Sequence, residues 1–219
     1  MRMIIRSIEG GYDKNLTYVI GCEKSGIGAI IDAAVGAEQI VNTANDADLQ
    51  LKYLIITHSH HDHYASAEPL LKKLRDLSVL TFGDALAHVA GDDILQISDG
   101  ETHHMGSIRL KFLHTPGHYP DCICVVANGA IFTGDTLFIG RTGRTISPKS
   151  DPRKLYQSIS EKILPLPDDL VIHPGHNYGP KLTNTLGKEK QKNEFLQAED
   201  EEEFITVMKE YEASRKQGD

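Results

Sequence analysis

The chain has 219 residues, 40% of them hydrophobic and 25% charged, which is the composition of an ordinary globular protein with a sizeable core. A net charge of −8, from 31 acidic and 23 basic residues, disfavours nucleic acid as the main partner. No apolar run is long enough to span a membrane, and the first residues lack an apolar leader segment. We therefore expect one domain over residues 1–219 in the cytoplasm, with a helical appendage at residues 185–219.

The sequence of the N-terminal third predicts short strands and helices. Residues 16–20 and 28–31 are rich in β-branched side chains and bounded by glycine or polar residues, which predicts two strands. A surface helix at 36–49 leads into a buried strand at 52–56. Residues 65–77 place four leucines at helical spacing with basic residues between them, which predicts an amphipathic helix.

The rest of the chain continues this mixture. Asn128-Gly129 is typical of a tight hairpin turn, and Asp151 followed by Pro152 is typical of a helix start. We predict strands at 79–82, 94–97, 108–113, 122–126, 130–133 and 170–172. We predict helices at 85–90, 153–164, 185–196 and 201–215. Because each half of the chain is predicted to form strands followed by a helix, we expect an α/β fold with two β-layers covered outside by helices.

The three cysteines, Cys22, Cys122 and Cys124, are expected to be free thiols. Their number is odd, and two of them alternate with apolar residues in a predicted strand. These features favour buried thiols in a reducing compartment over a disulfide framework.

Residues 57–63, with the sequence THSHHDH, directly follow the apolar strand and are rich in metal-binding side chains. His58 and His60 are two apart and can chelate one ion, while Asp62 and His63 are adjacent and could serve a second. Histidine and aspartate suit Zn²⁺, Fe²⁺ or Mn²⁺. A solvated loop is the alternative, but four histidines and an aspartate in six residues favour a metal site.

Three later segments each end a predicted strand with one further candidate ligand. His118 closes the sequence TPGH, Asp135 closes TGD and His176 closes PGH. Functional side chains often lie on loops held by a rigid scaffold. A carboxylate such as that of Asp135 has two oxygens and could bridge two ions about 3.5–4 Å apart.

The order of these motifs along most of the chain resembles the metallo-β-lactamase superfamily. The resemblance implies a four-layer αβ/βα sandwich, with two mixed sheets, outer helices and metals in a cleft at the sheet edges. Asp32 matches an early aspartate that would orient a ligand, although Ala33-Ala34 replaces the usual Pro or Thr-Gly after it. Carried over by motif, the first metal would be held by His58, His60 and His118, the second by Asp62, His63 and His176, with Asp135 as the bridge.

Further segments look like the glyoxalase II and persulfide dioxygenase branch: TGDTLF from residue 133, GRTGR from residue 140 and HNY from residue 176. True β-lactamases of the superfamily carry cysteine at the position of Asp135 or lack a bridging carboxylate, which disfavours antibiotic hydrolysis. In the resembling branch, residues matching Tyr178 and Arg144 contact the glutathione part of the substrate. Arg141 is a further candidate contact, and the alternative for both arginines is a solvent-exposed loop.

The resemblance implies hydrolysis of a small-molecule thioester, such as a hydroxyacylglutathione, by hydroxide held on two divalent ions, Zn²⁺ or else Fe or Mn. Asp62 would help to orient the nucleophile, so Asp62 and Asp135 are the expected catalytic residues. The alternative is a persulfide dioxygenase with a single Fe²⁺ held by His58, His118 and Asp135. A lactonase is a weaker alternative. Glyoxalase II proper has a longer C-terminal helical domain, which leaves room for a thiol carrier other than glutathione.

The remaining histidines are not expected to bind metal. His61 should face away from the cluster, and His114 and His173 lie on predicted strands, where packing or hydrogen bonding to a ligand is expected. His103-His104 are placed in a turn and His88 in a surface helix. No oligomeric state follows from the sequence.

Overall fold

The structure is a computed structural model that describes residues 2–83, 89 and 94–215. The predicted helix at 85–90, with His88, falls almost wholly outside the described residues. All three cysteines are buried free thiols, as expected.

The first sheet takes its six strands in chain order. Its first three strands run antiparallel and the remaining neighbours run parallel, so the sheet is mixed. The strands are β1 (Met3–Gly10), β2 (Asn15–Cys22), β3 (Ile27–Ile31), β4 (Gln50–Ile55), β5 (Ser78–Thr81) and β6 (Ile94–Gln96).

The second sheet also has six strands, in the order β12-β11-β10-β9-β8-β7. Only β10 and β11 run parallel, because a helical crossover joins them, and the other neighbours are antiparallel. The strands are β7 (Thr102–Met105), β8 (Ile108–His114), β9 (Ile123–Ala127), β10 (Ala130–Gly134), β11 (Val171–Pro174) and β12 (Asn184–Thr185).

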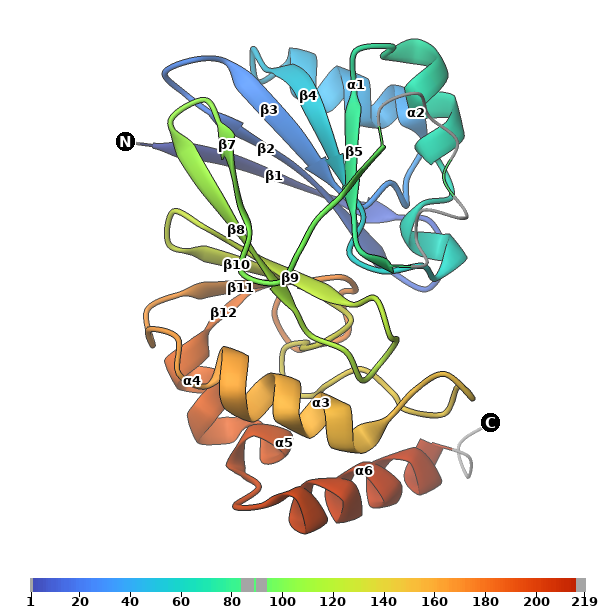
Figure 1. Ribbon diagram of the computed structural model, residues 1–219, viewed down its shortest axis with the longest axis vertical. Helices are drawn as coiled ribbons and strands as arrows, with labels where there is room; N and C mark the ends of the chain where they lie inside the picture. The colour runs from blue at the N-terminus through green and yellow to red at the C-terminus, as the bar shows by residue number, and fades with distance from the viewer. Residues whose placement is uncertain (1, 84–88, 90–93, 216–219) are drawn as a thin grey trace.

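Helices cover the outer face of each sheet, which confirms the expected four-layer sandwich (Figure 1). The first sheet is covered by α1 (Ala37–Asn45) and α2 (Ala67–Lys73). The second is covered by α3 (Pro152–Ser158) with its π-helical extension Ile159–Ile163, α4 (Leu186–Lys192), α5 (Glu194–Gln197) and α6 (Glu201–Arg215).

The apolar core between the sheets follows from strand alternation. Tyr18 and Ile20 of β2 point toward the second sheet, where Phe112 and Phe132 meet them. Tyr18 packs edge-on against Phe132 at 5.2 Å between ring centroids, and its hydroxyl donates to the carbonyl of Pro174 at 2.8 Å. Burial of each such side chain contributes about 1.5–3 kcal/mol. This contact fixes the end of β2 beside the end of β11, where the functional groups gather.

The structure contains three strands that the sequence did not predict: β1, β7 and β12. The turn predicted at His103-His104 is wrong, because both residues lie in β7. His103 packs against Phe112 and bonds to Glu101 at 2.7 Å, while His104 faces solvent. Each unpredicted strand lies at the edge of its sheet, and most of its side chains are half-buried or exposed, so its apolar periodicity is weak.

The predicted helix at 185–196 is two helices with a break at Asn193. The side chain of Asn193 accepts from the backbone N–H of Phe195 at 3.2 Å and so begins α5. Asp151 caps α3 in the same way, with Pro152 at the first position, as predicted.

No helix in the described part of the chain is long and apolar enough to cross a bilayer.

The C-terminal helices pack on the second sheet. Phe195 of α5 and Phe204 of α6 share the outer core of that sheet with Leu155 of α3. The single domain over residues 1–219 and the cytoplasmic location stay predictions.

Candidate metal centre

The histidine-rich segment leaves the end of β4 and is fixed at its first residue. The backbone N–H and the hydroxyl of Thr57 both donate to Asp32, at 2.8 Å each, and its carbonyl accepts from Ile123 of the second sheet at 2.9 Å. Residues 61–63 then form a short 3-10 turn. The side chains that follow Thr57 therefore start from a rigid point between the two sheets.

Three histidine nitrogens converge on one position, which we name the first half-site. Nδ1 of His60 lies 2.9 Å from Nε2 of His58 and 3.0 Å from Nε2 of His118. His118 comes from the loop after β8, on the opposite sheet. All three ligand atoms lie within 4.8 Å of one another.

Three further side chains form the second half-site. Nε2 of His63 lies 3.2 Å from Nε2 of His176, and Oδ2 of Asp62 lies 3.7 Å and 3.5 Å from these two nitrogens. His176 follows β11, so this half-site also draws on both sheets.

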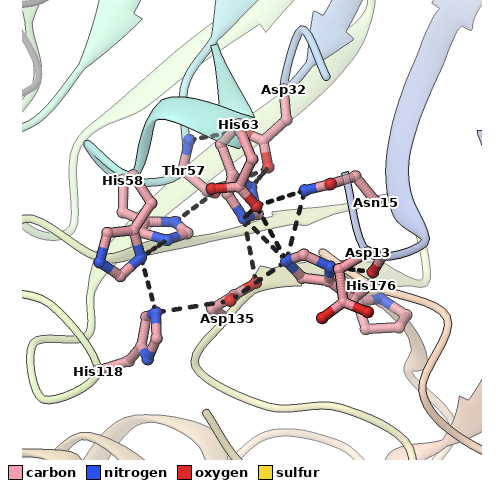
Figure 2. Close-up of polar contacts among 12 residues, drawn as sticks. Asp13, Asn15, Asp32, Thr57, His58, His63, His118, Asp135 and His176 are labelled. Atoms are coloured by element: carbon pink, nitrogen blue, oxygen red, sulfur yellow. Dashed lines mark hydrogen bonds and ion pairs between the residues drawn. The ribbon is translucent and has the colours of Figure 1, made fainter. Parts of the chain in front are cut away.

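Asp135, which follows β10, lies between the two half-sites (Figure 2). Its Oδ2 is 3.5 Å from Nε2 of His118 and 3.5 Å from Nε2 of His176. Its Oδ1 is 3.4 Å from Nε2 of His63 and has no hydrogen-bond partner among the described residues. Burial opposes ionisation, but the histidines around it hold the pKa of Asp135 well below its usual range.

In two of these histidines, the ring nitrogen that points away from the half-sites donates to a backbone carbonyl. Nδ1 of His118 donates to the carbonyl of Arg144 at 2.8 Å, and Nδ1 of His176 donates to the carbonyl of Asp13 at 2.9 Å. A carbonyl can only accept, so each Nδ1 carries the proton and each neutral ring presents its Nε2 lone pair to the centre.

Asp32 fixes His63 in the same manner. It follows β3 with a left-handed φ of 57°, and its Oδ2 lies 2.8 Å from Nδ1 of His63. Burial alone would lower the pKa of His63, but Asp135, Asp32 and Asp62 raise it to about 9. Asp32 therefore contacts one of the candidate ligands, His63, and its role in orienting that ligand stays a prediction.

The donor set of the first half-site fits a cation. The hydroxyl proton of Thr57 goes to Asp32, so Nδ1 of His58, 3.2 Å from that hydroxyl oxygen, must be the donor there. Nε2 of His58 and of His118 are then both acceptors, and His60 can donate to only one of them. Burial lowers the pKa of His58 well below its ordinary value and that of His60 to about 4, so protonation does not resolve the conflict at neutral pH. A divalent ion would satisfy all three lone pairs.

Two glycines allow this convergence. Gly134 has a φ of 46°, and a Cβ there would lie 2.7 Å from the side chain of Thr57. A Cβ at Gly175 would lie 2.5 Å from Oδ1 of Asp135 and 2.9 Å from the ring of His63. Any larger residue at Gly134 would displace Thr57, and any larger residue at Gly175 would displace the carboxylate of Asp135 or the ring of His63.

Residues 10–176 match the sequence model of the family described as the metallo-beta-lactamase superfamily. The chain belongs to the metallo-β-lactamase superfamily. Hydroxyacylglutathione hydrolase GloC of Haemophilus influenzae is 32% identical in a match of 204 residues, and the match covers 84% of this chain and 93% of GloC. Mitochondrial persulfide dioxygenase ETHE1 of Homo sapiens is 31% identical over 196 residues, which are 88% of this chain and 75% of ETHE1.

The crystal structure of ETHE1 from Myxococcus xanthus has a TM-score of 0.83 to this chain at 28% identity, covering 94% of this chain and 90% of that one. The expected superfamily, and its glyoxalase II and persulfide dioxygenase branch, are therefore confirmed.

In this superfamily member parts of both half-sites line a cavity of about 250 Å³. The candidate ligands that line it are His60, Asp62, His118, Asp135 and His176. Its other lining residues, which we call the rim, are Tyr12, Asp13, Phe138, Arg141, Thr142, Arg144 and Tyr178. The rim therefore contains all three residues predicted to contact substrate, and their role in binding stays a prediction.

Several rim residues are connected by hydrogen bonds and a cation–π contact. The guanidinium of Arg141 lies 4.0 Å from the ring centroid of Tyr178 and bonds to the hydroxyl of Tyr211 in α6. The hydroxyl of Tyr178 donates to Asp13 at 2.6 Å. Arg144 contributes its carbonyl to His118, while its side chain is exposed at the rim.

The other histidines among the described residues lie outside the two half-sites, as expected. His61 is exposed and contacts Tyr64. His114 stacks on Phe82 at 3.9 Å, and His173 stacks on a core phenylalanine at 4.9 Å. Burial lowers the pKa of His173 to about 4, so its ring is neutral and structural.

Sequence reasoning missed two residues here: Asp13 in the turn between β1 and β2, and Asn15, the first residue of β2. Asp13 supplies the carbonyl that holds His176, and Asn15 donates to Asp62 at 2.8 Å. Neither belongs to a metal-ligand motif. Their only signal in the sequence is the polar run Asp13-Lys14-Asn15 directly before a strand.

Proposed function

We propose that this protein is a metal-dependent hydrolase that cleaves a thioester with the help of two divalent ions, Zn²⁺ or alternatively Fe or Mn. One observation carries the proposal: a single oxygen, Oδ2 of Asp135, is equally distant from ligand nitrogens of both half-sites. A carboxylate in that position suits a dinuclear centre. A centre for one ion needs no oxygen shared in this way.

Divalent ions in these half-sites would lower the pKa of water and polarise a carbonyl group. Hydrolysis adds the elements of water across the thioester: a C–O bond forms at the acyl carbon, the C–S bond breaks, and the thiol leaves with a proton. Asp62 is suited to orient the attacking water, since its side chain is 24% exposed on the cavity wall and its Oδ2 is held in place. Asp135 would keep the two half-sites at a fixed distance from each other.

Glutathione is the thiol carrier that we propose first. GloC, a protein named as a hydroxyacylglutathione hydrolase, matches this chain over 93% of its own length, so the longer C-terminal domain expected for such enzymes is not required. Arg141 and Arg144 at the rim suit the carboxylates of a peptide thiol through bidentate contacts.

The test is cleavage of S-lactoylglutathione by protein loaded with two equivalents of Zn²⁺, followed by release of the free thiol. We expect turnover that stops when a chelator removes the metal. Cleavage of simple thioesters but not of S-lactoylglutathione would reject glutathione and keep the reaction class. Absence of thioester cleavage would reject the proposal.

The relatives named persulfide dioxygenase ETHE1 support a second candidate, an iron enzyme that oxidises a thiol persulfide with O₂. It would use His58, His118 and Asp135 to hold one Fe²⁺. Oxygen uptake on glutathione persulfide by a protein that contains one iron per chain would favour this candidate.

A further inference from the structure

The turn between β1 and β2 is docked on the loop that carries His176. The backbone N–H of Leu16 donates to the carbonyl of Gly175 at 2.8 Å, and that of Asn177 donates to the carbonyl of Lys14 at 2.9 Å. Lys14 adopts a left-handed φ of 60°, which turns the chain back toward this loop. The residue between these two contacts is therefore held with little freedom.

That residue is Asn15, whose side chain is fully buried beside the second half-site (Figure 2). Its amide nitrogen donates to Oδ2 of Asp62 at 2.8 Å and lies 3.4 Å from Nε2 of His176. Its amide oxygen is buried without a hydrogen-bond partner among the described residues. A buried asparagine with one half of its amide unpaired is costly to the fold. This cost indicates that the amide is retained for what it does to its neighbours.

Asp62 depends on this contact more than the other ligands of the half-site depend on theirs. His63 and His176 have side chains only 1% and 4% exposed, and each ring is held through its Nδ1. Asp62 is 24% exposed, and Asn15 donates to the same oxygen that faces the two histidines. Without Asn15 the carboxylate could turn toward solvent.

We propose that Asn15 is a positioning residue that sets the affinity of the second half-site for its metal ion, by holding Asp62 in the ligating orientation. The inference rests on the proposed two-ion function. An amide suits this task because it donates a hydrogen bond without adding a charge, so the carboxylate keeps its full attraction for a cation.

The effect is confined to one half-site. No hydrogen bond in the described part of the chain joins Asn15 to His58, His60 or His118. The first half-site therefore serves as an internal reference for the second.

The test is a calorimetric titration of metal-free protein with Co²⁺, which resolves the two ions, on wild type and Asn15→Leu. Loss of a residue that orients a ligand typically costs 10–100-fold in metal affinity. We expect a loss of about that size for the second ion and an unchanged first ion. Asn15→Ser, which removes the amide with less crowding, should weaken the second ion in the same way and serves if the leucine variant does not fold.

Asn177→Leu is the matched control. Its amide donates to Glu9 of β1 at 2.7 Å, and its side chain has no hydrogen bond to a ligand side chain among those described. We expect both ions to bind this variant as they bind the wild type.

Three results would overturn the role of Asn15: unchanged binding of both ions, equal weakening of both ions, or equal effects of Asn15→Leu and Asn177→Leu. These results leave the proposed function standing if wild type binds two ions and cleaves the thioester. A wild type that binds one ion would reject the two-ion proposal and the inference together.

Discussion

At the scale of residues, the site depends on a carboxylate that both half-sites share. Asp135→Ala removes the oxygens that lie 3.4–3.5 Å from three ligand nitrogens. We expect the variant to lose metal and to lose more than about 100-fold in kcat/KM, beyond the loss typical of a residue that only orients a ligand. Elemental analysis and thioester kinetics on one preparation measure both effects.

His61→Ala is the matched control for that variant, because His61 belongs to the histidine-rich segment 57–63 but is exposed and lies outside both half-sites. Its metal content and kcat/KM should equal those of the wild type. Metal loss in His61→Ala, or full metal content in Asp135→Ala, would contradict the ligand assignment.

The two half-sites should also differ in the pH dependence of metal binding. Nδ1 of His63 donates to Asp32, so the proton described by its pKa of about 9 sits on Nε2, the atom that faces the second half-site. The ion must displace this proton, so its affinity should rise about tenfold per pH unit up to about pH 9. His60, with a pKa of about 4, imposes no such competition near neutral pH.

Co²⁺ titrations of metal-free protein at roughly pH 6, 7 and 8 measure this difference. The second ion should bind more tightly at each step, while the first should change little. The same pH slope for both ions would contradict the assignment of His63 to the second half-site.

The candidate ligands could be predicted from the sequence because four of them lie within one short segment and the rest end strands in short, distinctive motifs. Asn15 and Asp13 could not. They act on residues far away in the chain, and Asn15 and His176 are separated by 161 positions. Only the docking of one turn on a distant loop makes them part of the site.

At the scale of elements, α6 packs against α3 and contacts the loop that forms the cavity rim. Tyr211 bonds to Arg141, and Glu212 accepts from the backbone N–H of Thr145 at 2.7 Å. The same loop provides the Arg144 carbonyl that holds His118. The C-terminal helix therefore holds the side chain of Arg141 and the backbone of the loop after Arg144 without lining the cavity.

Tyr211→Phe should raise KM about tenfold and leave kcat within about twofold. It removes one hydrogen bond to a charged group, worth about 1.5 kcal/mol, from a residue that is proposed to bind substrate. Steady-state kinetics on S-lactoylglutathione measure both constants. A fall in kcat with unchanged KM would place Tyr211 in the chemical step instead and contradict its role at the rim.

Element type was predicted well in two kinds of strand. In β8 buried and exposed side chains alternate, which gives a clear apolar period. In β2 and β10 every residue is buried, which gives a short run of mostly apolar residues. Edge strands lack that constraint, and β7 even presents two histidines. The break at Asn193 was missed because it depends on a side chain that caps the next helix rather than on a change of period.

At the scale of the whole molecule, the site joins the two sheets. The segment after β4 belongs to the first sheet, while His118, Asp135 and His176 follow strands of the second. Each half-site combines side chains from both sheets. An ion bound there therefore cross-links the layers of the sandwich, and metal binding and folding should be coupled.

Removing the metal should lower the melting temperature by about 10 °C. An ion at a free concentration about 1,000 times its Kd stabilises the folded state by about 4 kcal/mol, and each kcal/mol corresponds to about 2–4 °C in a chain of this size. Thermal denaturation followed by circular dichroism, with and without chelator, tests this. An unchanged melting temperature in demonstrably metal-free protein would show that the ions do not join the sheets.

The overall layering was predictable because alternating strands, amphipathic helices and the motif order all agree on one architecture. The pairing of the two sheets was not, since nothing in a linear pattern shows that the ends of β4, β8, β10 and β11 meet at one edge. That convergence becomes predictable only through the resemblance to a known family.

Titration of metal-free protein with Zn²⁺, followed by S-lactoylglutathione cleavage, is the most direct test of the proposed dinuclear centre. We expect activity to rise beyond the first equivalent and to reach its maximum at the second, because both half-sites contribute to one dinuclear centre. Maximal hydrolysis at one equivalent, or no hydrolysis at any metal content, would contradict it.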